Sequence, residues 1–96
     1  MKNLINKAKK TLLDNRQKNY TLPTNNKLYP AQWNWDSAFI ALGYSYFNLN
    51  FALKEIQTLL KGQWKDGMVP HILFHDINNN YYPNHTAWNC GNKIHS

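Results

Sequence analysis

The most constraining feature of the sequence is a helical stretch whose side chains are apolar on almost every face. Asp36 and Ser37 suit the N-cap and first turn of a helix. The residues behind them are Ala38, Phe39, Ile40, Ala41, Leu42, Gly43, Tyr44, Tyr46 and Phe47. A helix of this kind is stable when neighbours pack against all of its faces. A chain of 96 residues does not supply those neighbours, so we expect it to be incomplete on its own.

The segment that follows predicts a second helix with one wet face. We expect Asn48–Asn50 to make the turn and Asn50 to cap a helix from Phe51 to about Lys61. Its apolar face is predicted to hold Ala52, Ile56, Leu59 and Leu60, and its polar face Lys54, Gln57, Thr58 and Lys61. A fully packed helix beside a half-exposed one is the pattern that inner and outer helical layers require. The fold class predicted from this pair is all-α.

A further helix is predicted at the N-terminus, from Lys2 to about Lys18, and it is strongly basic. Its apolar residues recur at three- and four-residue spacings, namely Leu4, Ile5, Ala8, Leu12 and Leu13. The formal charge of the chain is +6, and the cations gather in this first segment. A basic helix can attract nucleic acid or an anionic membrane. Because the remaining chain is nearly charge-balanced, we interpret the lysines as a solvated face and expect neither partner.

Most of the remaining sequence predicts loops. Residues 19–30 break the first helix with Thr, Pro and Asn, and Asp66-Gly67 is a turn signal. Met68-Val69 and Ile72–Phe74 can form a short extended strand, and Asn78–Asn80 suggests a hairpin tip or a long loop.

The cysteine and histidine content gives no support to a disulfide or a metal centre. Cys90 is the only cysteine, which excludes an intrachain disulfide and a zinc site built from several cysteines. His71 and His75 have a metal-compatible spacing, but Pro70 disfavours a helix through them, so no metal site is predicted. Near the N-terminus no continuous apolar run occurs, so neither a signal peptide nor a membrane span is predicted, and cytoplasm is the expected location.

The segment from Tyr29 to Asp36 reads Tyr-Pro-Ala-Gln-Trp-Asn-Trp-Asp and carries the most informative chemistry. It places Tyr29, Trp33 and Trp35 just before the predicted packed helix. An aromatic ring covers the C–H face of a sugar, and a carboxylate accepts hydrogen bonds from two adjacent hydroxyls. The segment therefore indicates a sugar-binding site. The alternative is that both tryptophans belong to the core and that Asp36 is only a helix cap.

The expected position of Asp36 also indicates its role. At a helix N-terminus, the helix dipole favours the ionised carboxylate. An ionised group suits hydroxyl binding better than proton donation, because a general acid needs a raised pKa. A second candidate ligand is His71, in a loop with Trp64, which can donate to a sugar hydroxyl. The alternative for His71 is an ordinary surface histidine.

Taken together, the motifs Tyr-Pro-Ala-Gln-Trp-Asn-Trp-Asp-Ser-Ala-Phe and Gly-Gln-Trp-Lys-Asp-Gly-Met-Val-Pro-His resemble a known family. They look like the start of the catalytic domain of glycoside hydrolase family 63 and mannosylglycerate-hydrolase-like enzymes, over about residues 27–83. The resemblance implies an (α/α)6 barrel, of which this chain would form about three helices plus long loops. It also implies inverting hydrolysis of an α-linked sugar, with no metal and no organic cofactor.

The resemblance assigns substrate-binding roles but no catalytic residue in this chain. The implied binding residues are Tyr29, Trp33, Trp35, Asp36, His71 and, less firmly matched, Tyr81. In the family, the general acid (an Asp) and the general base (a Glu) lie far downstream, and no residue here corresponds to either. Inversion requires two carboxyl groups roughly 6.5–9.5 Å apart with a water between them. Asp66 is a poor partner for Asp36 because it belongs to a turn motif.

The sequence therefore predicts that residues 1–96 are the N-terminal fragment of an (α/α)6 glycosidase domain, inactive alone. The intact enzyme is expected to act on a small α-linked glucoside or mannoside, such as a glycosylglycerate or an oligosaccharide. Trehalase-like and debranching-type barrels are alternatives within the enzymes. A non-catalytic carbohydrate-binding fragment and a small basic nucleic-acid binder are the alternatives outside them. The oligomeric state stays open.

Overall fold

The computed structural model describes residues 1–24, 28–76 and 81–90. Its helices are α1 (Lys2–Asp14), α2 (Asn34–Ser45) and α3 (Leu49–Leu60), and its strands are β1 (Gln32–Trp33) and β2 (Ile72–Leu73). Three helices with two minimal strands confirm the predicted all-α class. Within the described ranges, every helix is too short or too polar to cross a membrane.

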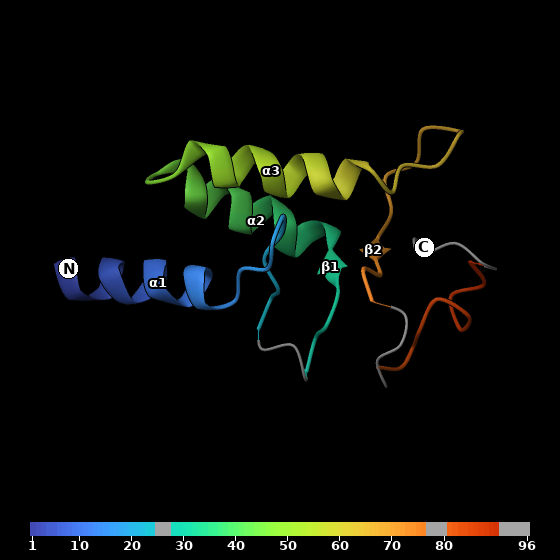
Figure 1. Cartoon of the computed structure of the whole chain (residues 1–96), viewed down its shortest axis with the longest axis horizontal. Helices are drawn as coiled ribbons and strands as arrows, with labels where there is room; N and C mark the ends of the chain where they lie inside the picture. Colours follow the sequence, from blue (N-terminus) through green and yellow to red (C-terminus); the bar gives the residue numbers. More distant parts are fainter. Residues whose placement is uncertain (25–27, 77–80, 91–96) are drawn as a thin grey trace.

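The helices α2 and α3 form an antiparallel pair that lies side by side (Figure 1). Ala41 and Tyr44 of α2 meet Ala52 of α3 in a buried cluster, and Phe51 and Ile56 pack against it. Asn48, in the turn between the helices, caps the N-terminus of α3: its Oδ1 accepts the backbone N–H of Phe51 at 3.1 Å. The predicted cap at Asn50 is wrong, because the tight connection places Asn50 already inside α3.

The start of α2 is fixed by the small sheet. Strand β1 pairs antiparallel with β2, with Gln32 opposite Leu73 and Trp33 opposite Ile72. The next backbone N–H, that of Asn34, donates to the carbonyl of His71 at 2.9 Å. The first turn of a helix has N–H groups without a partner in the helix, and the β2 side of the sheet supplies an acceptor for one of them. The helix therefore begins at Asn34, with Trp33 as the N-cap, and Asp36 is not the cap.

Helix α1 is shorter than predicted and lies on the surface. It ends at Asp14 because the chain turns back there, with an isolated bridge between Arg16 and Thr21. None of its side chains is buried. A polar tether holds it to α2: the hydroxyl of Tyr44 donates to the carbonyl of Leu12 at 3.0 Å.

Helix α2 is not packed on every side in this structure. Ser37, Ala41 and Tyr44 form its buried face. On the opposite side Phe39 is 66% exposed and Tyr46 is 83% exposed. The uncovered apolar side chains explain why the sequence predicted neighbours all round, and those neighbours are not supplied by α1, α3 or the described loops.

The faces of α3 differ from prediction at two positions. Thr58, predicted on the polar face, is buried because its Oγ1 donates to the carbonyl of Asn19 at 2.9 Å. Leu60, predicted on the apolar face, is exposed. The loop before residue 24 therefore covers α3 from a direction that the pattern of apolar residues did not reveal.

A buried carboxylate joins three segments of the chain. Glu55 of α3 is 1% exposed, and its two oxygens accept three hydrogen bonds. Oε1 accepts the backbone N–H of Thr21 at 2.7 Å. Oε2 accepts Gln32 Nε2 at 2.9 Å and Ser37 Oγ at 2.7 Å. Three segments that are distant in sequence converge on this one side chain.

Two further links extend the network in opposite directions. Gln32 Oε1 lies 2.9 Å from His75 Nε2, and because an amide oxygen only accepts, the histidine nitrogen donates. The His75 ring stacks on Tyr20 with centroids 3.8 Å apart. On the other side Thr21 Oγ1 lies 3.0 Å from the Tyr44 hydroxyl. That hydroxyl has one proton, which it donates to Leu12, so Thr21 is the donor to Tyr44.

Burial shifts the pKa values of both ionisable ends of the network. Burial raises the pKa of Glu55, although the bonds from Ser37, Thr21 and Gln32 act against the shift. Burial lowers the pKa of His75 to about 4, and the nearby cation of Lys61 adds to this effect. At neutral pH His75 is therefore an uncharged hydrogen-bond donor.

Removing the hydroxyl that tethers α1 should destabilise the fold. We expect Tyr44→Phe to lower the free energy of unfolding by about 1–2 kcal/mol, because the Leu12 carbonyl and the Thr21 hydroxyl both lose a buried partner. Urea unfolding followed by circular dichroism measures the change. The matched control is Tyr46→Phe at the C-cap of the same helix, which removes an exposed hydroxyl and should change stability by less than about 0.5 kcal/mol. Equal effects of the two changes would contradict the tether.

The stability that depends on neutral His75 should fall in acid. Its pKa is lowered from 6.5 to about 4 in the folded chain, so the unfolded chain binds the proton more readily. The contribution is thus complete above pH 6.5 and is lost as pH falls from there through about 4. Glu55, with a raised pKa, titrates in the opposite sense, so the histidine share is the difference between wild type and the non-titrating His75→Gln. A His75 ring resonance that titrates near 6.5 in the folded chain would disprove this prediction.

Candidate functional site

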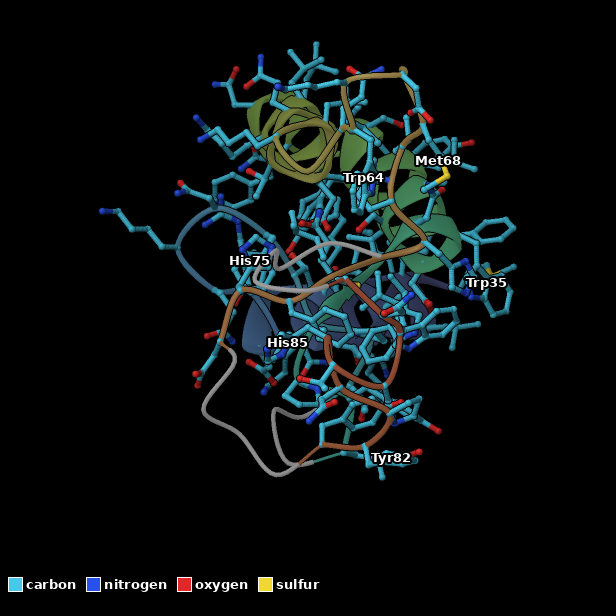
Figure 2. The ribbon with its side chains drawn as sticks, turned by 90° about the vertical axis from the view of Figure 1, so that its right-hand side faces the viewer. Trp35, Trp64, Met68, His75, Tyr82 and His85 are labelled. Carbon is cyan, nitrogen blue, oxygen red and sulfur yellow. The ribbon has the colours of Figure 1, made fainter. Side chains whose placement is uncertain are left out.

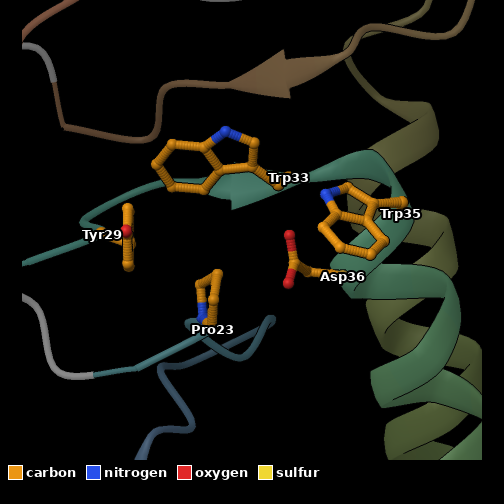
Figure 3. Close-up of a pocket in the computed structure, with 5 residues that line it drawn as sticks. All are labelled: Pro23, Tyr29, Trp33, Trp35 and Asp36. Atoms are coloured by element: carbon orange, nitrogen blue, oxygen red, sulfur yellow. The ribbon is translucent and has the colours of Figure 1, made fainter.

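A hollow of about 300 Å³ lies where β1 passes into α2. Its lining residues are Pro23, Tyr29, Trp33, Trp35 and Asp36, and Figure 3 shows them arranged around a common space. Four of these five belong to the sugar-binding residues predicted from the sequence. The structure therefore brings the predicted aromatic and acidic residues together in one place.

Trp33 is held by packing from the small sheet. It lies against the buried cluster of Ala31, Ile72 and Phe74. Its ring also meets two tyrosine rings edge to face, with centroids 5.7 Å away at Tyr29 and 5.5 Å away at Tyr81. Such contacts orient rings as well as bury them. Trp33 is thus a fixed aromatic surface on one side of the hollow.

Trp35 is a more open aromatic surface in the first turn of α2. It is 63% exposed and meets Phe39, one turn later, with centroids 6.2 Å apart. Figure 2 shows Trp35 projecting outward, on the opposite side of the view from His75. An exposed indole beside a hollow is available to cover the apolar face of a ligand.

Asp36 contributes the carboxylate of the hollow, and its electrostatics differ from prediction. Figure 3 shows its carboxyl group directed into the space between the aromatic rings. Partial burial raises its pKa, and a bond from its own backbone N–H opposes the shift. The sequence predicted that the helix dipole would favour ionisation, but loss of hydration in the hollow has the larger effect.

Tyr81 and His71 are placed differently from the other four predicted residues. Tyr81 contacts Trp33 and also Tyr29, with 6.4 Å between the Tyr81 and Tyr29 centroids. It therefore supports these two lining residues, which together with Trp35 we call the aromatic wall of the hollow. Burial raises the pKa of the Tyr81 hydroxyl, and Tyr29 adds to the shift. His71 is not among the residues that line the hollow; its ring packs at a tilt on Trp88, with centroids 5.6 Å apart.

The buried polar residues that lie behind the lining of the hollow were not predicted from the sequence. Gln32 lies within the predicted segment Tyr29–Asp36 and Ser37 directly follows it, and both bind the buried Glu55. A signal for Glu55 was present: it follows Ala52 by three residues and precedes Leu59 by four, so it lies on the apolar face of its helix. A carboxylate at such a position requires buried donors.

The five acidic residues of the chain can each be placed. Asp14 pairs with Lys10, and Asp66 accepts the N–H of Met68 at 3.0 Å in a turn where Gly67 has a φ of 97°. Glu55 is buried in the network, and the charge of Asp76 acts on Tyr20. Among the described residues, Asp36 is the acid that lines the hollow.

The histidines and acids of the described ranges do not gather as metal ligands do. Three side chains of His, Cys, Asp or Glu come together nowhere in these ranges. His71 and His75, whose spacing is compatible with metal binding, contact Trp88 and Tyr20 respectively. Cys90 is buried, which raises the pKa of its thiol. The predicted tip at Asn78–Asn80 and the chain beyond Cys90 lie outside the described residues.

The known proteins that this chain resembles in sequence are all named as hydrolases of a glycosylglycerate. Mannosylglycerate hydrolase MGH1 of Selaginella moellendorffii is 43% identical over 86 residues, which is 90% of this chain and 17% of the relative. Mannosylglycerate hydrolase of Rubrobacter radiotolerans is 40% identical over 94% of this chain and 20% of the relative. Glucosylglycerate hydrolase of Mycolicibacterium hassiacum is 43% identical over 64% of this chain and 14% of the relative.

A solved structure shares the fold. The GH63 mannosylglycerate hydrolase from Thermus thermophilus, in complex with Tris, superposes with a TM-score of 0.82 at 42% identity. The match covers 90% of this chain and 21% of that chain. The same enzyme in complex with Tris and D-glycerate superposes with a TM-score of 0.77.

The chain thus spans about a fifth of the length of the curated relatives it matches. The profile of the mannosylglycerate hydrolase MGH1-like glycoside hydrolase domain matches residues 29–96, which include both motifs and the lining residues from Tyr29 to Asp36. The chain belongs to this family of glycoside hydrolase domains.

Proposed function

We propose that this chain forms one wall of the sugar-binding site of a glycosidase. The observation that carries the proposal is the hollow in which Tyr29, Trp33 and Trp35 surround the carboxylate of Asp36. The aromatic rings suit the C–H faces of a pyranose, and the carboxylate suits its hydroxyls. The names of the relatives, all glycosylglycerate hydrolases, support the same class of activity.

The proposed substrate is a small α-linked glucoside or mannoside, with a glycosylglycerate favoured over an oligosaccharide. The relatives are named as mannosylglycerate and glucosylglycerate hydrolases, so both sugars occur in their substrates. These relatives favour a glycosylglycerate over the substrates of trehalase-like and debranching-type enzymes.

In this proposal the chain binds substrate, and it does not perform the proton transfers. Inverting hydrolysis needs an acid and a base on opposite sides of the scissile bond. Among the acids of this chain, Asp36 alone lines the hollow within the described residues, and the others have the structural positions given above. We therefore expect the isolated chain to be inactive, and the barrel around it remains a prediction.

We assign Asp36 to substrate binding through its carboxylate. The raised pKa makes this assignment testable, because a raised pKa is also what a general acid requires. The position of Asp36 beside Trp35 and within reach of the aromatic wall favours contact with hydroxyls at the rim of a ring that lies on these aromatics.

Replacing Asp36 with Ala in an intact enzyme that carries this segment should make it nearly inactive. Removal of a charged partner from a desolvated site costs several kcal/mol, about 2–5, of transition-state stabilisation. If Asp36 binds substrate, the residual activity keeps a bell-shaped pH profile, and glycosides with good and poor leaving groups suffer alike. Asp66→Ala, which removes an exposed turn carboxylate, is the matched control and should retain activity.

A selective rescue of Asp36→Ala by activated aryl glycosides would refute the binding role. Good leaving groups need no protonation, so they escape the loss of a general acid. Loss of the basic limb of the kcat profile would point the same way and would make Asp36 the proton donor.

The proposed role of His71 as a substrate ligand is separable from its packing on Trp88. His71→Phe keeps a ring for the contact with Trp88 but removes both nitrogen atoms. If the imidazole binds a sugar hydroxyl, kcat/KM in the intact enzyme should fall by the equivalent of about 1–3 kcal/mol. Trp88→Ala is the comparison that loses the ring contact but keeps the imidazole. Unaltered kinetics in His71→Phe would return His71 to a structural role.

A further inference from the structure

We infer that Glu55 is a positioning residue that sets the geometry of the hollow from behind, without contact with a ligand. The inference about geometry stands on the hydrogen-bond network, and its consequence for sugar binding rests on the proposed function. Glu55 is buried on α3 and does not line the hollow. Its three donors, however, come from the segments that carry the lining residues.

Glu55 holds both ends of the segment Gln32–Ser37, an arrangement that we call the clamp. A single oxygen, Glu55 Oε2, accepts Gln32 Nε2 at 2.9 Å and Ser37 Oγ at 2.7 Å. Gln32 directly precedes Trp33, and Ser37 directly follows Asp36. Both ends of the segment that presents Trp33, Trp35 and Asp36 are therefore fixed to one atom.

The clamp acts where the backbone of this segment changes from strand to helix. At Trp33 the chain is extended, with φ −91° and ψ 139°, and the next residue is already helical. Among the described residues, no side chain caps the helix there. The pairing of β1 with β2 and the bond from the Asn34 N–H to the His71 carbonyl fix the end of the strand, and Glu55 adds a hold on each side of the change. Gln32 on the strand side and Ser37 on the helix side are the two residues that Glu55 holds.

The other oxygen reaches the opposite side of the hollow. Glu55 Oε1 accepts the backbone N–H of Thr21 at 2.7 Å, and Thr21 lies two residues before Pro23. Pro23 lines the hollow across from the segment of Trp33 and Asp36 (Figure 3). The width of the hollow between these two sides is therefore set through one carboxylate.

A carboxylate is the side chain that this arrangement demands. It accepts on both oxygens, and all three of its partners are donors. In Glu55→Gln the new NH2 group faces either the N–H of Thr21 or the donors of Gln32 and Ser37. A donor then opposes a donor in either orientation, although the size of the side chain is unchanged. Gln32 Nε2 keeps its second bond, to the Glu55 backbone carbonyl at 2.9 Å, so we expect the mismatch to move the other side chains that hold the hollow.

The indole N–H resonances of the full 96-residue chain report this movement directly. Assignment of Trp33, Trp35 and Trp64 by single Trp→Phe changes gives two probes in the hollow and one outside it. In Glu55→Gln we expect the Trp33 and Trp35 resonances to shift by several linewidths while Trp64 stays in place. Unmoved Trp33 and Trp35 resonances in a folded Glu55→Gln chain would overturn the inference.

Thr58→Val is the matched control for a general loosening of α3. It removes one buried hydrogen bond from the same helix, to the carbonyl of Asn19, at nearly constant volume. Thr58 does not line the hollow. The inference requires Trp33 and Trp35 to remain unshifted in this variant. Equal shifts in Thr58→Val and Glu55→Gln would show that Glu55 is merely structural.

If Glu55→Gln does not fold, a variant that removes only one hydrogen bond of Glu55 tests the same inference. Ser37→Ala removes one donor from Oε2 and leaves the carboxylate with its other two partners. We expect the Trp35 resonance to shift, since Trp35 lies two residues from Ser37, and Trp64 to stay. An unshifted Trp35 in Ser37→Ala would overturn the clamp.

Binding of methyl α-D-mannoside to the intact enzyme separates this inference from the proposed function. If both hold, Glu55→Gln and Ser37→Ala weaken binding about tenfold or more, since small misplacements of a site are costly. If the wild-type enzyme binds and cleaves no glycoside, the proposed function fails while the resonance shifts still test the positioning. Wild-type affinity in Glu55→Gln with shifted indoles would overturn the positioning role in sugar binding.

Discussion

The fold depends on a buried carboxylate that unites three parts of the chain. Burying an ionised group without partners costs several kcal/mol, and donors must offset that cost. Glu55 receives its donors from the loop before residue 24, from β1 and from the first turn of α2. Loss of any one donor leaves a charge under-satisfied, so the three segments are specified together. The same requirement explains why so small a sheet, two residues in each strand, can hold a defined register.

The predictions from the sequence that succeeded concern features set by residues close together along the chain. Helices were recoverable because α2 and α3 carry long apolar patterns whose period is local. The aromatic and acidic lining of the hollow was recoverable because Tyr29, Trp33, Trp35 and Asp36 are close in sequence. The family resemblance implied a sugar-binding role for the same residues, and that role stays a prediction. Features that depend on residues close together in the sequence could therefore be predicted from it.

The errors arose where a distant segment decides the outcome. Thr58 is buried because the carbonyl of Asn19 requires its hydroxyl, and no pattern within α3 contains that information. Asp36 is not a cap because the carbonyl of His71 already accepts the first N–H of the helix. Its pKa rises because surrounding rings exclude water, which outweighs the favourable end of a helix. Each of these facts is a tertiary contact that overrides a local rule.

Binding and proton transfer place different demands on a fold, and the proposed role of this chain is the first. A binding wall needs aromatic surfaces and one acceptor fixed relative to each other, which Glu55 can achieve from behind within three helices. An inverting pair needs two carboxyl groups that face each other across the substrate, about 6.5–9.5 Å apart. Two carboxyl groups so placed must come from opposite walls, and the acids of this chain other than Asp36 are engaged in a turn, an ion pair, the buried network or the neighbourhood of Tyr20. If the proposed chemistry holds, the acid and the base are therefore supplied by residues other than those described here, and the raised pKa of Asp36 reflects loss of hydration at a binding surface.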